Sequence, residues 1–163
     1  MEYELIEVTP DEIESLRGAM LSMHEAERQV QPVLGHAPIR TDDDFWKLYT
    51  ARFPGWFHNG DGFCIAARSP EGEILGHVFG VVKEGDIGFD SGDEIGYIED
   101  IAVIERARGE GLGGVLLDAA RSRFAERGLR SFKLSTVPGN DDARRFYARH
   151  GLKPAAQLLI GEV

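Results

Sequence analysis

The stretch of residues 106–114, RARGEGLGG, has the residue types and spacing of a phosphate-binding loop. Read from Gly109 it is G-x-G-x-x-G, the spacing of a dinucleotide-binding turn, and read from Arg108 it is R-x-x-G-x-G. Its glycines lack a Cβ atom, so the backbone can approach a ligand closely. A helix that begins here would add unpaired N–H groups and the positive end of its dipole, and Arg108 would add a cation. The loop therefore predicts a pyrophosphate site, with a simple tight turn as the alternative.

The first of these spacings, that of a nicotinamide-dinucleotide site, fails two tests of context. Such a turn places its first glycine directly after a strand and has an acidic residue about 20 positions further on. Here the strand is expected to end at Val103, so residues 104–108 intervene, and Lys133 stands 20 positions after Gly113. A Walker-type loop is excluded because no Gly-Lys-Ser/Thr follows. An NAD-dependent oxidoreductase is therefore disfavoured.

A second motif lies downstream, at residues 140–152, with the sequence NDDARRFYARHGL. It resembles the N-x-x-A-x-x-F-Y-x-x-x-G-F pattern of the GNAT superfamily of N-acetyltransferases, with Leu152 in place of the usual aromatic residue. Upstream, YIEDIAV at residues 97–103 followed by R-x-x-G-x-G resembles the acetyl-CoA segment of the same family. The two motifs stand in the family's order and at about its separation. The resemblance covers roughly residues 74–154, and residues 1–60 fit only the family's order of elements.

The resemblance implies acetyl-CoA as the co-substrate and assigns residues to it by position. The strand with residues 98–103 should splay away from the strand with residues 133–137, and the pantetheine arm should lie in the gap. The backbone of Ile101 and Val103 should meet the arm and the acetyl carbonyl, and Arg108 should lie at the mouth of the pyrophosphate site. The expected cofactor-binding residues are Ile101, Ala102, Val103, Arg108, Gly109, Glu110, Gly111, Leu112, Gly113, Gly114 and Asn140.

Acetyl transfer to an amine needs a base for the ammonium, whose pKa is roughly 10, and a proton for the departing thiolate. The resemblance implies Tyr147 as the acid near the thioester sulfur; the alternative is a half-buried aromatic residue that closes the helix onto the sheet. Glu99 is the first candidate base, and Asp100 is a second candidate or a structural carboxylate. As neighbours on a strand the two should face opposite sides, with Glu99 on the face of Ile101 and Val103.

The elements that must position these residues follow from periodicity and capping signals. Helices are expected after Thr9-Pro10, after Thr41, from Gly111 to Arg127, and from Asp141 to His150. Strands are expected at residues 4–8, 63–68, 74–82, 97–103, 131–137 and 157–160. The order predicts an α+β fold with a mixed sheet. The resemblance makes it a mostly antiparallel central sheet, flanked by helices and with splayed central strands, in a single N-acetyltransferase domain over residues 1–163.

Composition bounds the partners and the compartment. The chain has 163 residues, a net charge of −10 and a single cysteine. The acidity disfavours nucleic acid, and no apolar stretch approaches the roughly 18 residues that span a membrane. The lone Cys64 and the acidic N-terminus favour a cytoplasmic protein. The five histidines have no metal-ligand spacing, so no metal is expected. Homodimers are common among similar enzymes, and the sequence leaves a homodimer open.

Function therefore divides between an enzyme and a binding module. The first reading is acetyl transfer to a primary amine by direct attack in a ternary complex, because no cysteine is placed to carry an acetyl group. The acceptor is left open among a small amine, an amino acid derivative, an aminoglycoside-like compound and a protein amino group. The alternative is a regulatory module that binds CoA or acetyl-CoA without turnover.

Overall fold

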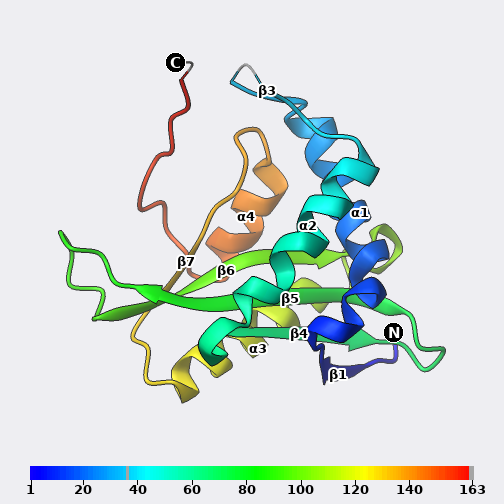
Figure 1. The fold of residues 1–163 in the computed structure, drawn as a ribbon, viewed down its shortest axis with the longest axis horizontal. Coiled ribbons are helices and arrows are strands. Elements are labelled where there is room, and N and C mark those ends of the chain that lie inside the picture. Colours follow the sequence, from blue (N-terminus) through cyan, green and yellow to red (C-terminus); the bar gives the residue numbers. More distant parts are fainter. Residues whose placement is uncertain (36, 162–163) are drawn as a thin grey trace.

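The computed structural model describes residues 1–35 and 37–161, and of Asn59 only the backbone (Figure 1). The strands are β1 (Glu4–Glu7), β2 (Val33–Leu34), β3 (Ala37–Pro38), β4 (Gly62–Arg68), β5 (Ile74–Glu84), β6 (Glu94–Val103) and β7 (Phe132–Leu134). The α-helices are α1 (Arg17–Val30), α2 (Asp42–Trp56), α3 (Leu112–Glu126) and α4 (Asp141–Arg149). Short 3-10 helices are η1 (Pro10–Leu16), η2 (His58–Gly60) and η3 (Glu105–Ala107).

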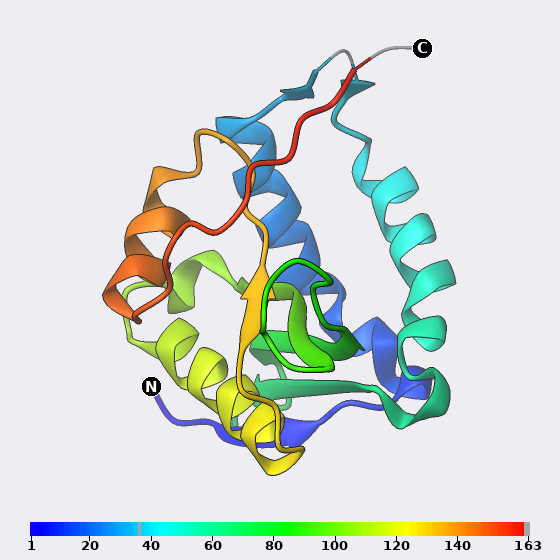
Figure 2. The ribbon, with the colours of Figure 1, turned by 90° about the vertical axis from the view of Figure 1, so that its left-hand side faces the viewer.

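A five-stranded sheet in the order β1-β4-β5-β6-β7 forms the centre of the molecule. Its strands pair antiparallel except for β6 and β7, which run parallel. Helices α1 and α2 cover one face of the sheet, and α3 covers the other with α4 beside it (Figure 2). The predicted α+β class with a mixed, mostly antiparallel sheet is confirmed. No helix within the described ranges is both long enough and apolar enough to span a bilayer.

Aromatic packing fixes both layers of helices on the sheet. Phe79 of β5 meets Phe53, Trp56 and Phe57 from the end of α2, with ring centroids 5.1–5.2 Å apart. On the other face the ring of Phe124 from α3 rests on two glycines of the sheet: a Cβ added at Gly96 would lie 2.8 Å from it, and one at Gly80 would lie 2.9 Å from it. A side chain at either position would clash with the Phe124 ring, and one at Gly80 would also clash with Phe63 of β4.

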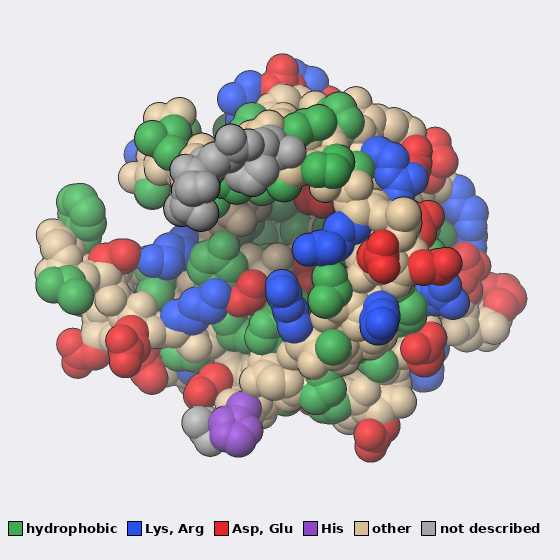
Figure 3. All heavy atoms as spheres, turned by 45° about the horizontal axis from the view of Figure 1, so that its top comes forward, with side chains coloured by type: hydrophobic (Ala, Val, Ile, Leu, Met, Phe, Trp, Pro, Cys, Tyr) green, Lys and Arg blue, Asp and Glu red, His purple; other side chains and the backbone are tan. Residues whose placement is uncertain are grey.

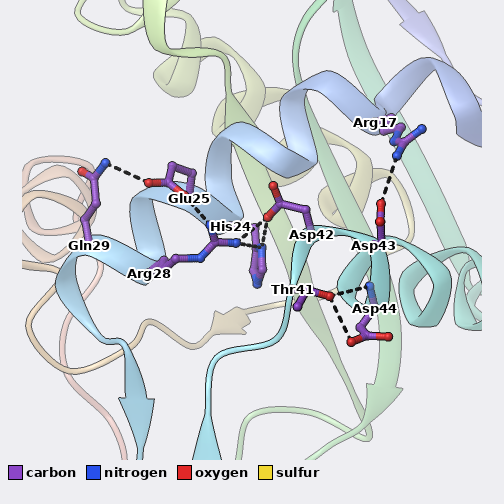
Figure 4. Close-up of polar contacts among 9 residues, drawn as sticks. All are labelled: Arg17, His24, Glu25, Arg28, Gln29, Thr41, Asp42, Asp43 and Asp44. Carbon is purple, nitrogen blue, oxygen red and sulfur yellow. Dashed lines mark hydrogen bonds and ion pairs between the residues drawn. The ribbon is translucent and has the colours of Figure 1, made fainter.

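A polar cluster joins the second half of α1 to the start of α2 (Figure 4). Asp42 accepts a hydrogen bond from the Arg28 guanidinium. It accepts a second one, of 3.1 Å, from Nδ1 of the buried His24. The hydrogen bond from Arg28, with that from His24 second, holds the pKa of Asp42 below its ordinary value. His24 also stacks on Phe45, with ring centroids 4.2 Å apart. These contacts set where the last turns of α1 lie.

Two predictions about strands were wrong: one strand is shorter than predicted, and another does not form. The strand expected at residues 131–137 contains only β7, Phe132–Leu134. Residues 157–160 form no strand, and the side chains of Leu158 and Leu159 are 89% and 83% exposed. Apolar residues in an extended segment become a strand only when a neighbouring edge accepts their backbone hydrogen bonds. In the part of the chain that the structure describes, no edge pairs with them.

The predicted start of α2 is confirmed and can be tested. Thr41 Oγ1 accepts a hydrogen bond from the Asp44 N–H at 3.2 Å. Replacing Thr41 by Ala removes this cap, which typically costs about 1 kcal/mol. For a chain of this size Thr41→Ala should lower the melting temperature by about 2–4 °C in a calorimetric scan. Thr41→Ser keeps the hydroxyl and should melt near the wild type; an equal drop in both variants would contradict the cap.

Candidate active site

A gap opens in the sheet where β6 leaves β7. The two strands pair only from Gly96 to Ile98. Where the strands pair, the Gly96 N–H donates to the carbonyl of Ser131, just before β7, at 3.1 Å. Just after the other end of β6, the Ile104 N–H donates to the Leu75 carbonyl of β5 at 3.0 Å. Because backbone groups alternate along a strand, those of Ile101 and Val103 point away from β5 and into the gap. No described residue of β7 pairs with them, as the sequence predicts for the splayed strands.

The backbone groups of Ala102 point to the opposite edge of β6, which pairs with β5. It was predicted to bind the cofactor together with Ile101 and Val103, but alternation turns its backbone groups to β5, where it pairs with His77. Its side chain is buried. The assignment of Ala102 to the cofactor stays a prediction, and the gap presents the backbone of every second residue of β6.

A β-bulge at Glu99 changes which side chains share a face. Phe79 of β5 pairs with Asp100, whereas its neighbour Gly80 pairs with Ile98, so Glu99 is an extra residue. Directly paired residues point to the same face, which puts Asp100 on the α1 and α2 face with Phe79. Glu99 lies on that face too, because its carboxylate is 2.6 Å from the Lys83 ammonium. Glu99 and Asp100 were predicted to face opposite sides of the sheet, with Glu99 on the same face as Ile101. Both predictions were wrong, because the bulge interrupts the alternation of side chains along β6.

Glu99 therefore lies in a different setting from the one expected. It lines a cavity of about 330 Å³ beside the end of α2, together with Trp56, His58 and Lys83. The Lys83 ammonium, which pairs with Glu99, also lies 3.7 Å from the centroid of the Tyr97 ring. The carboxylate thus has a fixed cation as a partner.

Asp100 lies at the centre of a buried hydrogen-bond network. His77 Nε2 donates to one carboxylate oxygen at 2.7 Å and the Tyr49 hydroxyl donates to the other at 3.0 Å. Burial, with the charge of Asp100 second, raises the pKa of Tyr49, so this hydroxyl keeps its proton. Both oxygens of Asp100 are engaged, which suits the structural role weighed for it.

The glycine loop ends in the exposed N-terminus of α3. Gly109 and Gly111 have φ of +82° and +83° and open space where a Cβ would be, and Gly111 is the N-cap. The N–H groups of Leu112 and Gly113 are the first of the helix and have no partner within it. Glu110 is exposed and the Leu112 side chain is buried, so the loop offers mainly backbone.

The last two glycines of the loop have a packing role. A Cβ at Gly113 would lie 3.3 Å from the Phe146 ring, and one at Gly114 would lie 2.9 Å from His150 Nε2. Both neighbours come from the end of α4. Gly113 and Gly114 therefore let α4 lie against the N-terminus of α3, which brings the second sequence motif to the first.

Arg108 and Asn140 both make contacts within the protein. Arg108 Nε donates to the Val103 carbonyl, and its Nη2 donates to the carbonyl and the hydroxyl of Ser22 on α1, each at 3.0 Å. The guanidinium thus joins the end of β6 to α1, and its place at the mouth of a phosphate site stays a prediction. Asn140 Oδ1 accepts from the Ala143 N–H at 3.1 Å and caps α4, which leaves its amide nitrogen for a ligand.

Tyr147 lies on α4 beside the gap, near two carboxylates. Burial raises the pKa of Tyr147 to about 12, and the charges of Glu27 and Asp100 act in the same direction. Viewed with the top of Figure 1 turned forward, this end of the molecule has a hollow with hydrophobic side chains on its walls and both basic and acidic side chains around it (Figure 3). Tyr147 keeps its proton at neutral pH and can act as a donor.

Glu27 of α1 was not anticipated. The signal for it in the sequence is weak but physical: Met20, Met23 and Glu27 are spaced by three and four, so a carboxylate continues the stripe by which α1 faces the sheet. Among the described residues, no set of three or more His, Cys, Asp or Glu side chains is arranged to hold a metal ion.

Comparisons with known proteins agree with this geometry. The model of the Acetyltransferase (GNAT) family matches residues 21–152. Mycothiol acetyltransferase of Cellulomonas flavigena is 34% identical over 109 residues, which are 65% of this chain and 30% of that protein. The chain therefore spans less than a third of the length of this relative.

Solved structures share the fold. The GCN5-related N-acetyltransferase from Ralstonia eutropha JMP134 has a TM-score of 0.77 at 20% identity, over 99% of each chain. AAC(6')-Iy, in complex with the bisubstrate analog CoA-S-monomethyl-acetylneamine, has a TM-score of 0.71 at 15% identity, over 100% of this chain and 99% of that one. At these identities the likeness establishes the architecture.

Blocking the glycine loop should abolish acetyl-CoA binding. Gly111→Glu places a bulky anion at the N-terminus of α3, where the pyrophosphate is expected, and isothermal titration should detect no binding. Gly128→Glu is the matched control, because Gly128 also has positive φ (+77°) and open space but lies at the other end of α3. It carries the same strain and charge and should bind normally. Unchanged affinity in Gly111→Glu, or equal loss in both, would overturn the loop assignment.

Proposed function

The chain belongs to the acetyltransferase (GNAT) family, and from this premise we propose that it moves the acetyl group of acetyl-CoA to a primary amine by direct attack in a ternary complex. The observation that carries the proposal is the gap between β6 and β7, where no described residue of β7 pairs with the backbone of Ile101 or with the N–H group of Val103. The start of α3 and helix α4, which carries Tyr147, lie beside the same gap (Figure 2). We also propose that residues 1–163 form one acetyltransferase domain.

The cofactor proposal rests on complementary chemistry. An extended pantetheine arm has amide groups that can pair with the strand edge at Ile101 and Val103, much as a further strand would. The pyrophosphate would accept hydrogen bonds from the N–H groups of Leu112 and Gly113, at the positive end of α3. Since Arg108 holds the Val103 carbonyl, Val103 would offer its N–H group.

The proposed reaction uses backbone and side-chain groups of this chain. The amine nitrogen attacks the acetyl carbon, and a backbone N–H in the gap stabilises the oxyanion. The C–S bond then breaks, and the Tyr147 hydroxyl protonates the CoA thiolate. A carboxylate removes the proton of the ammonium, and Glu99 and Asp100 are the carboxylates proposed for this role from the sequence.

We propose a primary amine as the acceptor class. One relative is named for acetylation of mycothiol, and one structural neighbour was solved with an acetylneamine analog of CoA. These names support a small molecule as the acceptor, with a protein amino group as the alternative.

Release of free thiol from acetyl-CoA against a panel of amines, alongside titration of acetyl-CoA, tests the activity. The expected result is binding together with turnover on one class of amine. Binding without turnover across small amines and peptides would favour a regulatory module that senses CoA. No binding at all would contradict the cofactor assignment.

Replacing Tyr147 by Phe tests the acid. The variant keeps the ring and loses the proton donor, so turnover should fall by about 10–1000-fold while acetyl-CoA affinity stays near normal. Tyr3→Phe, in the segment before β1, is the control and should react like the wild type. If Tyr147→Phe turns over at the wild-type rate, Tyr147 has only a packing role.

A further inference from the structure

We propose that Glu27 is the catalytic base: its carboxylate receives the acceptor's ammonium above the gap between β6 and β7 and takes one proton from it. This assignment rests on the proposed acetyl transfer. It goes beyond that proposal because it moves the base from the strand, where the sequence suggested Glu99, to helix α1.

Helix α1 is anchored on both sides of the gap. At one side Ser22 accepts two hydrogen bonds from Arg108, whose Nε is bound to the end of β6. At the other side the Val30 carbonyl lies against Gly139, in the loop after β7, so closely that a Cβ there would be 3.0 Å away. With a rise of 1.5 Å per residue, Glu27 lies about 7.5 Å beyond Ser22 and about 4.5 Å before Val30. It is therefore carried on the segment of α1 that bridges the gap.

The side chain of Glu27 is directed to the sheet. Met20 is buried and Met23 packs against the core, and Glu27 follows on the same face of α1. Burial raises the pKa of Tyr147 on α4, and the charge of Glu27 adds to it; burial also raises the pKa of Glu27, and the charge of Asp100 on β6 adds to it. Helix α1, strand β6 and helix α4 thus bring Glu27, Asp100 and Tyr147 within electrostatic reach of one another.

Of the three carboxylates near the gap, Glu27 is the one available to a substrate. Glu99 is paired with Lys83, and both oxygens of Asp100 are occupied by His77 and Tyr49. Burial and the charges of His24 and Asp100 act on the pKa of Glu27, and no described residue donates a hydrogen bond to its carboxylate. A half-buried carboxylate without a donor is costly unless a ligand supplies one. An ammonium group supplies both a donor and a countercharge.

The proton transfers balance. The acceptor R-NH3⁺ gives one proton to the Glu27 carboxylate, and the free amine forms the N–C bond while the C–S bond breaks. The thiolate takes the Tyr147 proton, and the second nitrogen proton released by amide formation restores Tyr147. Glu27 then loses its proton to solvent. The sum is R-NH3⁺ plus acetyl-CoA giving the amide, CoASH and one proton.

The groups facing Glu27 give the assignment a characteristic pH dependence. Burial raises the pKa of Glu27, Asp100 adds to the rise, and His24 on the same helix opposes it. A base works when deprotonated, so kcat/KM should rise with pH through a pKa above the ordinary value of 4.5. Tyr147, with a pKa of about 12, does not titrate in this range.

The test compares Glu27→Gln, Glu99→Gln and Glu25→Gln with the wild type. Glu25 is exposed on the same helix and paired with Arg28, so its variant is the matched control. At neutral pH Glu27→Gln should lose about 10²–10⁴-fold in kcat/KM, the range of general-base contributions, with acetyl-CoA affinity unchanged. The limb at the Glu27 pKa should vanish and be replaced by a rise that continues to the pKa of the amine, roughly 10, so the deficit should shrink toward pH 10, where the amine loses its proton unaided.

Three results would overturn the assignment: wild-type kinetics in Glu27→Gln, a limb that survives in it at the wild-type pKa, or the large loss appearing in Glu99→Gln instead. If Glu27→Gln melts early or fails to bind acetyl-CoA, Glu27→Asp replaces it and should show a smaller loss with the acid limb retained. A wild type that binds acetyl-CoA but acetylates no amine would refute the proposed function itself, and the Glu27 assignment with it. Because the wild type is measured first, the two failures are distinguishable.

Discussion

A strand carries hydrogen-bonding groups on both of its edges, and beyond Ile98 one edge of β6 has no strand to satisfy it. Buried backbone groups are rarely left unpaired, so an open edge inside a fold requires either a ligand or water. Here the edge is flanked by the N-terminus of α3, whose first N–H groups are also without intrahelical partners. The arrangement of the surrounding helices, and the chemistry we propose, depend on this one interruption of the sheet.

Three features position the groups around the gap. The bulge at Glu99 shifts the alternation of β6, so that Asp100 turns to the face covered by α1 and α2, where His77 and Tyr49 hold it. On that face the His24–Asp42 contact fixes the last turns of α1 above the gap. On the opposite side, Gly113 admits the Phe146 ring, which brings α4 and Tyr147 up to the thioester's expected position.

The sequence predicted those elements around the candidate site that depend on local chemistry, while the roles of Asn140 and Tyr147 stay predictions that the resemblance implies. The glycine loop, the helix after it, the Asn140 cap and Tyr147 are encoded within short stretches, and periodicity located the helices. The bulge was not predictable, because it is a property of the register between β5 and β6 and no residue type marks it. In the sequence little distinguishes Glu27 from other helical carboxylates, because its role depends on the position of α1 over the gap. The apolar residues 157–160 suggested a strand, but a strand also needs an edge to pair with.

The central claim is that acetyl-CoA occupies the gap between β6 and β7. Amide hydrogen exchange, followed by NMR with and without acetyl-CoA, tests this most directly because it reports on individual backbone N–H groups. The account predicts that the amides of Ile101, Val103, Leu112 and Gly113 exchange quickly in the free protein and become protected when acetyl-CoA binds. Binding that leaves these four amides exchanging as before, with protection elsewhere, would contradict it.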